Sequence, residues 1–407
     1  MSSSKTNLRR ILSGILIYLI GLLASTASAG DLEKLADANT GFAFDLLKQI
    51  AKEQPGTNVF ISPFSVSTVL QMVDNGAAGE TKQEIERVLH TDNLPVNALN
   101  AACKDLGQSL NSQTNVILNL ANAIWYQEEF QLKPGFVSAN REFFGAKLAG
   151  VDFDSPQSAK IINDWADKST RGKIKDVVQW PFPPATQVVL ANAIYFKGKW
   201  AEPFDKSQTK PRAFHLANSK MEQTPMMRQA RKFSYQEGDG FQAVRLPYAG
   251  KRLQMYLFLP ATNSSPAKLL ADFSGENWRD KISPEFSERE GMLVFPRFKL
   301  NYDVLLNKSL ESLGMKQAFV EGVADFHPMV INDNLFITKV KQKSFVDVNE
   351  EGTEAAAVTT VMLSNRAMPL RPPKPFEMIV DRPFFFVIGD SETQSILFMG
   401  VMYDPVN

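Results

Sequence analysis

The chain has 407 residues, of which 44% are hydrophobic and 22% are charged, and it contains 23 glycines and 23 prolines. This ordinary globular composition excludes a collagen-like repeat, intrinsic disorder and a disulfide scaffold. Lys plus Arg and Asp plus Glu each number 44, so the chain lacks the net positive charge typical of nucleic-acid binding, and we expect no nucleic-acid partner. The only cysteine, Cys103, cannot form an internal disulfide. The three histidines have no local metal-ligand spacing, so we predict neither a metal site nor a cofactor.

The N-terminus predicts a secretory signal peptide. Three basic side chains in residues 5–10 precede an apolar run over 11–24, and Ala-Ser-Ala at 27–29 is a pattern that signal peptidase accepts. An uncleaved membrane anchor is the alternative, but 14 helical residues rise only about 21 Å, too short to span a bilayer. We therefore predict a signal peptide, 1–29, and one secreted domain, 30–407, with no membrane partner. The domain would be extracellular, or periplasmic if the source is a Gram-negative bacterium.

The remaining chain reads as a single α+β domain without repeats or an early linker. Apolar residues at helical spacing predict helices over 32–52 and 158–168, the second with Ile161, Ile162 and Trp165 on one face. Alternating β-branched and aromatic residues predict strands in the second half, over 252–259, 292–300, 335–348, 384–388 and 395–402.

The strand 335–348 has two distinct faces. Lys339, Lys341 and Lys343 alternate with apolar and small polar residues, so we expect the lysine face to meet water and the other face to meet the core. The stretch that follows, 349–361, is ambiguous. Its first part favours a helix by propensity, whereas Thr359, Thr360 and Val361 favour an extended chain.

Four separated motifs, in this order, resemble those of the serpin family: NVFISPFS at 58–65, NAIYFKGKW at 192–200, NEEGTEAAA at 349–357 and DRPF at 381–384. The resemblance runs from about residue 31 to 405. It implies three β-sheets, a layer of about eight or nine helices and an exposed reactive loop at about 350–382. It also implies an inhibitor rather than an enzyme: a serine protease attacks the loop, and the cleaved loop enters the central sheet and traps the acyl-enzyme. We expect a monomer that forms this covalent complex.

The hinge of the loop supports insertion in one register. If the chain from Thr353 onward forms a strand, alternate residues face inward. Glu354, the only charged residue in 353–363, then faces water. Gly352 suits a pivot because glycine tolerates unusual backbone angles. The predicted hinge residues are Glu351, Gly352, Thr353, Glu354, Ala355, Ala356 and Ala357.

The reactive bond is expected between Arg366 and Ala367. The family pattern counts 14 residues from Gly352 to the bait residue, which is Arg366. The other basic residues of the loop each precede a proline, and trypsin-like proteases cleave such bonds poorly. An arginine bait is complementary to the acidic specificity pocket of a trypsin-like protease.

The resemblance also implies a polar cluster beneath the central sheet, built from Ser62, Ser65, Asn192 and the residue at 342. The family has His at that last position, where this chain has Gln342; glutamine both donates and accepts hydrogen bonds but does not titrate. Ser62 and Ser65 could instead cap a helix. Trp200 would lie where the loop first enters the sheet, or would be an ordinary core aromatic.

Two other functions compete with inhibition. A non-inhibitory serpin, acting as carrier, chaperone or plain protease substrate, tends to have bulky, charged or proline residues in the hinge, which Thr353 and residues 355–357 are not. A secreted hydrolase would fit less well, because the chain has no G-x-S-x-G or H-E-x-x-H motif. Some serpins are activated by glycosaminoglycans that bind a basic helix. The matching residues here, 98–110, contain only Lys104 against Asp105, so we do not expect such activation. Asn263 and Asn307 are glycosylation sequons.

Overall fold

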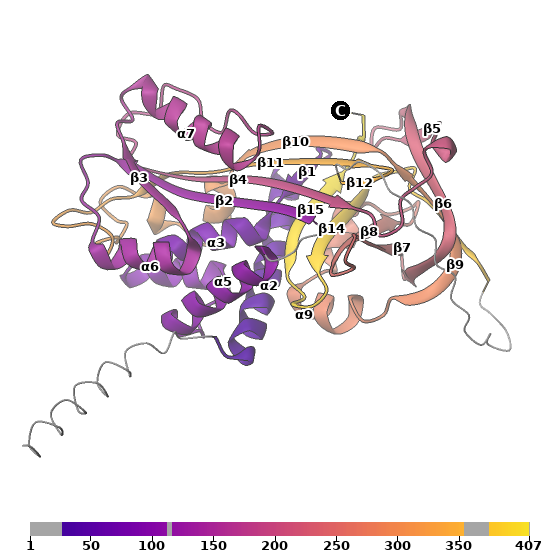
Figure 1. Cartoon of the computed structure of the whole chain (residues 1–407), viewed down its shortest axis with the longest axis horizontal. Helices are drawn as coiled ribbons and strands as arrows, with labels where there is room; N and C mark the ends of the chain where they lie inside the picture. The colour runs from indigo at the N-terminus through magenta and orange to yellow at the C-terminus, as the bar shows by residue number, and fades with distance from the viewer. Residues whose placement is uncertain (1–26, 112–115, 354–373, 407) are drawn as a thin grey trace, which may run out of the picture.

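The computed structural model describes residues 27–111, 116–353 and 374–406 (Figure 1). Most of the predicted signal peptide lies outside these ranges, and so does most of the predicted reactive loop. The predicted site residues outside them are Glu354, Ala355, Ala356, Ala357, Arg366 and Ala367.

A six-stranded sheet forms the centre of the described structure. Its strands, in spatial order, are β10 (Phe298–Leu305), β11 (Ile337–Asn349), β12 (Gly352–Thr353), β4 (Val188–Lys199), β2 (Val116–Gln127) and β3 (Lys147–Val151). Strands β4 and β11 also pair directly with each other, and they run parallel. The two-residue strand β12 lies between them at one end only.

A nine-stranded sheet packs beside it and extends to the other end of the molecule (Figure 1). Within the described residues its order is β1 (Val59–Ile61), β15 (Ile396–Met402), β14 (Phe384–Asp390), β8 (Leu253–Pro260), β7 (Phe241–Pro247), β6 (Met221–Gly238), β9 (Ser287–Pro296) and β13 (Phe376–Ile379), with β5 (Lys210–His215) beside β6. The 18-residue strand β6 pairs with β5 near its start and with β7 near its end. The long strand β6 therefore joins two of the three expected sheets into this nine-stranded sheet.

Helices cover both faces of the six-stranded sheet (Figure 1). In the described ranges they are α2 (Ala29–Glu53), α3 (Pro63–Asp74), α4 (Gly79–Val88), α5 (Val96–Asn111), α6 (Pro134–Phe144), α7 (Pro156–Ser169), α8 (Pro266–Ala271), α9 (Gly275–Asn277) and α10 (Asn307–Leu313). Helix α7 lies across one face, where Ile162 packs in a cluster with Trp125 and Phe345. Helix α3 lies against the other face and contacts β2 and β4. Buried apolar surface on both faces stabilises the sheet.

The predicted helices 32–52 and 158–168 are confirmed as α2 and α7, and most predicted strands are confirmed as well. The predicted strand 292–300 is wrong as a single element. The chain leaves one sheet at Pro296 and begins β10 in the other at Phe298, so one apolar run serves two sheets. Ile161 is also not on the buried face of α7: its side chain is 47% exposed, whereas Ile162 is fully buried.

The lysine face of β11 does not simply meet water as predicted. Lys343 is only 6% exposed, and its Nζ donates to the Asp176 carboxylate (2.7 Å) and to the Asp176 carbonyl (3.0 Å). Lys339 lies over the Phe182 ring at 5.4 Å. Both partners belong to the segment after α7, which covers this face; the sequence pattern of β11 alone carries no information about that cover.

Candidate functional site

The central feature of the site is the parallel contact between β4 and β11, which we call the seam. The seam pairs Val188–Tyr195 with Ile337–Phe345. Beyond it, β12 pairs on one side with Val348 and Asn349 of β11 and on the other with Gly198 and Lys199 of β4, antiparallel to both. The two strands are thus already separated by one strand at this end, directly before the predicted loop begins.

Gly352 and Thr353, the two residues of β12, fill the space between β4 and β11 at this end, which we call the wedge. Gly352 has φ +146°, and a Cβ added there would lie 2.2 Å from the Gly198 carbonyl oxygen, so no other residue fits without displacing β4. Thr353 is fully buried, and its hydroxyl lies 2.9 Å from the Tyr248 hydroxyl. The side chain of Thr353 therefore points inward and has a polar partner below the sheet. Burial raises the pKa of Tyr248, so its hydroxyl stays protonated and can donate this bond.

Trp200 connects the wedge to the turn between β11 and β12. Its Nε1 donates to the Asn349 carbonyl (2.9 Å), and its backbone N–H donates to the Glu351 carbonyl (3.0 Å). The indole stacks on Tyr248 with ring centroids 4.6 Å apart. Trp200 is only 4% exposed, so it is both a core aromatic and a contact of the predicted hinge.

Charged side chains hold the turn between β11 and β12. Glu350, 4% exposed, accepts a hydrogen bond from the Thr209 hydroxyl (2.7 Å) and pairs with Arg297 (3.6 Å). Glu351 pairs with Lys206 of the short helix η2 (Lys206–Gln208). The predicted hinge includes Glu351, whereas the partners of both acids come from distant parts of the chain and have no sequence signal near the hinge.

A buried polar cluster lies beneath the seam. Gln342 of β11 is fully buried and uses its whole amide: Oε1 accepts from the Ser62 N–H (3.0 Å), and Nε2 donates to the Ser62 carbonyl (3.0 Å) and to Asn192 Oδ1 (2.8 Å). Asn192 is the partner of Gln342 in β4. This last bond therefore crosses the seam and must break when the strands separate.

Two further strands tie into the same cluster. Asn192 Nδ2 donates to the Ser65 hydroxyl and to Asn122 Oδ1, and the Ser65 hydroxyl donates to Asn122 Oδ1 (3.0 Å). Ser62 Oγ donates to the Leu397 carbonyl of β15 (2.7 Å). Asn122, in β2, was not predicted; its only sequence signal is a polar residue within an apolar strand. The structure brings together all four predicted members of the cluster.

Ser62 also caps helix α3. Its backbone is extended, its hydroxyl accepts from the Ser65 N–H (3.3 Å), and Pro63 follows as the first helical residue. For Ser62 the two alternatives are therefore both present, because the same hydroxyl starts the helix and joins the cluster. Ser65 contributes its N–H to the cap and its hydroxyl to the cluster. The cap fixes the position from which Ser62 reaches the strands.

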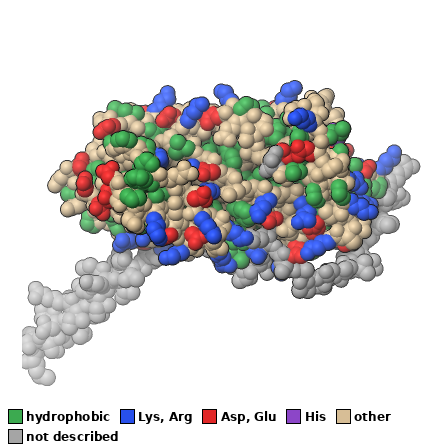
Figure 2. Space-filling view, turned by 90° about the horizontal axis from the view of Figure 1, so that it is seen from above, with side chains coloured by type: hydrophobic (Ala, Val, Ile, Leu, Met, Phe, Trp, Pro, Cys, Tyr) green, Lys and Arg blue, Asp and Glu red, His purple; other side chains and the backbone are tan. Residues whose placement is uncertain are grey.

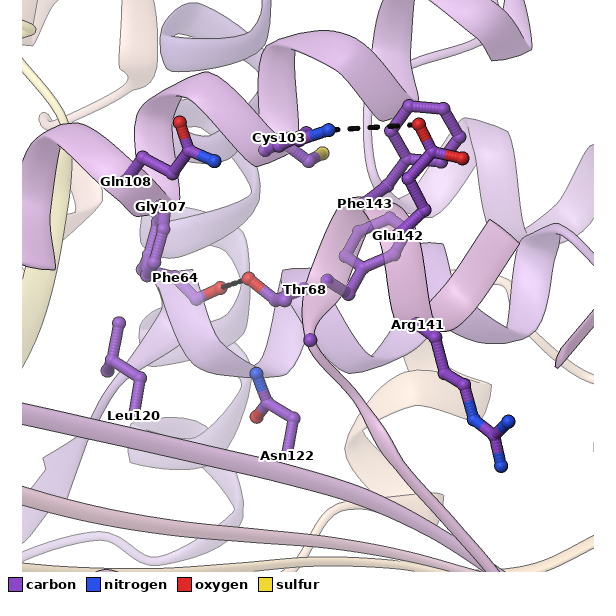
Figure 3. A pocket seen from close by; sticks show the side chains of 13 residues that line it. Phe64, Thr68, Cys103, Gly107, Gln108, Leu120, Asn122, Arg141, Glu142 and Phe143 are labelled. Carbon is purple, nitrogen blue, oxygen red and sulfur yellow. Dashed lines mark hydrogen bonds and ion pairs between the residues drawn. The ribbon is translucent and has the colours of Figure 1, made fainter. Parts of the chain in front are cut away.

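A cavity of about 280 Å³ borders the cluster (Figure 3). Leu120 and Asn122 of β2 line one side, Phe64 and Thr68 of α3 another, and Cys103 of α5 faces it (Figure 3). The thiol of Cys103 bonds to Gln71 Oε1, and burial raises its pKa. This thiol is therefore protonated at neutral pH and is not a reactive nucleophile.

The remaining predicted residues have plain structural positions. Asn263 is exposed, whereas Asn307 donates through Nδ2 to the Thr338 carbonyl (3.0 Å) and accepts from the Val340 N–H (2.9 Å). Among the described residues no group of His, Cys, Asp and Glu could hold a metal ion. Searching the same residues, we find no helix long and apolar enough to cross a membrane.

Comparison with known proteins identifies the class. The family model described as Serpin (serine protease inhibitor) matches residues 37–405. An uncharacterized serpin-like protein of Thermococcus kodakarensis is 38% identical over 383 residues, covering 92% of this chain and 87% of that protein. The leukocyte elastase inhibitor of Equus caballus is 36% identical over 387 residues, covering 92% of this chain and all of that protein.

Solved structures agree. The native state of tengpin, a thermophilic serpin, superposes with a TM-score of 0.84 and 27% identity, covering 93% of this chain and 95% of that chain. Human thyroxine-binding globulin with thyroxine gives a TM-score of 0.83 and 28% identity, covering 92% of this chain and 99% of that chain. The chain belongs to the serpin family and has its α+β fold. The family is one of protease inhibitors rather than of enzymes.

Proposed function

We propose that this chain is a secreted inhibitory serpin that traps trypsin-like serine proteases, with Arg366 as the bait residue and Arg366–Ala367 as the reactive bond. The protease attacks that bond and forms an acyl-enzyme. The released loop then inserts between β4 and β11 before the acyl bond is hydrolysed.

The position of β12 carries this proposal. Gly352 and Thr353 are paired on both sides, in the antiparallel direction that an inserting strand requires. Thr353 already faces the interior, so an inserted strand that continued from it would alternate in the register that turns Glu354 outward. Insertion would extend an existing strand rather than nucleate a new one.

The seam offers a route for that extension. Insertion replaces one parallel contact between β4 and β11 by two antiparallel contacts, which adds a full row of backbone hydrogen bonds. A net gain of roughly 0.5–1.5 kcal/mol for each added bond favours the inserted state. Separation of β4 from β11 must break the bond from Gln342 to Asn192, which opposes premature opening.

A carrier function is the second candidate, because thyroxine-binding globulin, solved with a bound small molecule, shares the fold at 28% identity. The fold alone therefore does not separate an inhibitor from a carrier. The hinge does, since small residues at 355–357 suit burial within a packed sheet and bulky or charged ones would not.

Incubation with trypsin tests the proposal. We expect an SDS-stable complex and a released C-terminal fragment that begins at Ala367. Arg366→Glu should abolish the complex while shifting the melting temperature little, since exposed loop substitutions usually change stability by within about ±0.5 kcal/mol. Arg371→Glu is the matched control, because that arginine precedes a proline. A complex that survives Arg366→Glu would show that another residue is the bait.

A further inference from the structure

Positive charge is concentrated in one stretch of this electrically balanced chain. Residues 197–232 contain nine Lys or Arg and three Asp or Glu, although the whole chain has 44 of each class. The stretch comprises the end of β4, helix η2, β5 and most of β6. These elements lie at one end of the molecule, opposite β3 (Figure 1), and Figure 2 shows Lys and Arg side chains at that end as well as along the rest of the visible face.

Strand register places several of these cations around the wedge. Lys199 pairs with Gly352, and Lys206 pairs with Glu351. Lys210 and Arg212 of β5 pair with Met226 and Thr224 of β6, and the Arg297 N–H donates to the carbonyl of the intervening Pro225 (2.9 Å). We call Lys199, Lys206, Lys210, Arg212 and Arg297 the basic surface.

Most of this charge is available to a partner. Lys199, Lys210 and Arg212 are exposed, and none of them has an ion-pair partner among the residues that the structure describes. Lys206 and Arg297 do pair with Glu351 and Glu350, yet their own side chains remain 68% and 50% exposed. The acids of the same stretch, Glu202, Asp205 and Glu222, are too few to balance it.

The basic surface lies beside the first of the two anchors of the predicted reactive loop. One anchor is Thr353 in β12. The other is Lys374, whose carbonyl accepts from Arg289 Nε (2.9 Å) just before β13. Strands β5, β6, β9 and β13 are neighbours in the nine-stranded sheet, and the basic surface reaches the first anchor through the pairs Lys206–Glu351 and Arg297–Glu350. A protease that binds the 20-residue segment between the anchors is therefore tethered within reach of the basic surface.

We propose that the basic surface is a docking site for an acidic face of the target protease, and that it selects among enzymes with the same bait specificity. This inference rests on the proposed function and adds the charge of the partner to it. Complementary charge accelerates encounter 10-fold to 1000-fold at low salt and loses this effect at high salt. A sulfated polysaccharide fits the same charge, but the surface borders the first loop anchor, next to the segment that the protease must bind.

The test compares anionic and cationic trypsin, two enzymes that both cleave after arginine. The readout is the rate of attack on the chain, counted as complex plus cleaved chain, at about 0.05 M and about 1 M NaCl. We expect the wild type to react at least about tenfold faster with anionic trypsin at low salt, and within about twofold at high salt. The double variant Lys210→Glu, Arg212→Glu should lose this preference.

Lys147→Glu with Lys175→Glu, at exposed positions outside the basic surface, is the matched control and should keep the preference. Equal rates for both trypsins at low salt, or an unchanged preference in the Lys210, Arg212 variant, would overturn the inference. If the rates are equal and a sulfated polysaccharide matrix retains the wild type but not the variant, the surface binds a polysaccharide and not a protease. Cleavage without complex would overturn the proposed function instead, and the salt dependence of attack would still decide the role of the surface.

Discussion

At the scale of single residues, Gln342 connects β4 and β11, the two strands that would separate under the proposed mechanism. Its side chain is held by Ser62 on one side and Asn192 on the other, and none of these groups titrates between pH 4 and 9. The cluster therefore holds the seam equally at any physiological pH. A histidine at this position, as the family has, would titrate within that range and lose its acceptor on protonation.

Replacing Gln342 should therefore weaken the seam. Gln342→Leu leaves the Ser62 N–H and Asn192 Oδ1 buried without their partner, at a cost of about 1–3 kcal/mol. We expect the rate of heat inactivation to rise about tenfold for each 1.4 kcal/mol lost from the barrier. Thr338→Val, which removes a bond to Gln187 at the far end of β11, is the control and should change the rate less. Equal rates in both variants would show that the cluster does not hold the seam closed.

Asp74 of α3 is a buried acid that makes stability depend on pH. Burial raises its pKa from 3.8 to about 6, although Lys82 lies 2.6 Å away. Because the folded chain holds this proton more tightly than the unfolded chain, ionisation removes stability as pH rises from about 4 to 6. The loss amounts to roughly 3 kcal/mol and is complete above pH 6.

The variant Asp74→Asn should lack this dependence. We measure the thermal midpoints of both proteins at one scan rate from pH 4 to 7. The midpoint of the wild type should fall relative to that of Asp74→Asn as pH rises. The Lys82 ion pair forms only as Asp74 ionises, so its contribution is already contained in the pKa of about 6 and adds no further slope. Parallel curves for the two proteins would contradict the assigned pKa.

At the scale of elements, the wedge makes a sharp prediction about the hinge. Thr353→Arg places an unpaired cation in a fully buried position, at an effective cost of several kcal/mol. The intact variant avoids this cost by withdrawing residues 352 and 353 from between β4 and β11, so insertion must bring the cation back in. If about 2.7 kcal/mol of the cost is felt in the transition state, insertion slows about a hundredfold and deacylation wins. The variant should be cleaved after Arg366 and release active protease. Glu354→Arg, predicted to face water, should remain an inhibitor.

The number of inhibitor molecules consumed per protease decides between these outcomes. We expect a value near one for Glu354→Arg and far above one for Thr353→Arg. The same loss in both variants would mean that the alternation of inward and outward residues does not continue beyond Thr353.

Elements also show what could be predicted from sequence. Helix α2 and strands β8, β14 and β15 follow from periodicity, because each buries one face or a continuous apolar run. Ser62 and Asn192 lie within short motifs that resemble the family, and Ser62 has in addition a capping signal. Asn122 and Tyr248 could not be found in this way, since their roles depend on which strands become neighbours. The same reason explains why the cover over Lys343 was missed.

At the scale of the whole molecule, the position of one strand between β4 and β11 is occupied only at one end in the described fold. Residues 352 and 353 occupy the first part of the place between β4 and β11, while the rest of that place is closed by the parallel seam. In the intact chain the loop is tied at β12 and at β13, so it cannot extend along the seam without moving the second anchor. Under the proposed mechanism we therefore expect a topological barrier and a kinetic stability of the intact protein.

Cleavage at Arg366 should remove that barrier and stabilise the protein. About ten residues could then extend β12, and at roughly 0.5–1.5 kcal/mol for each added hydrogen bond they would stabilise the fold by about 5–15 kcal/mol, which corresponds to a rise of at least about 10 °C in the thermal midpoint. Calorimetry before and after limited cleavage by trypsin measures this rise. The midpoint of the intact form should also depend on scan rate, because it reports an unfolding rate. Cleaved Thr353→Arg is the internal control: it has the same broken bond but a blocked first position, so it should gain little. Equal midpoints for intact and cleaved wild type would show that the loop does not insert, and the seam would then be a permanent contact rather than the path of a mechanism.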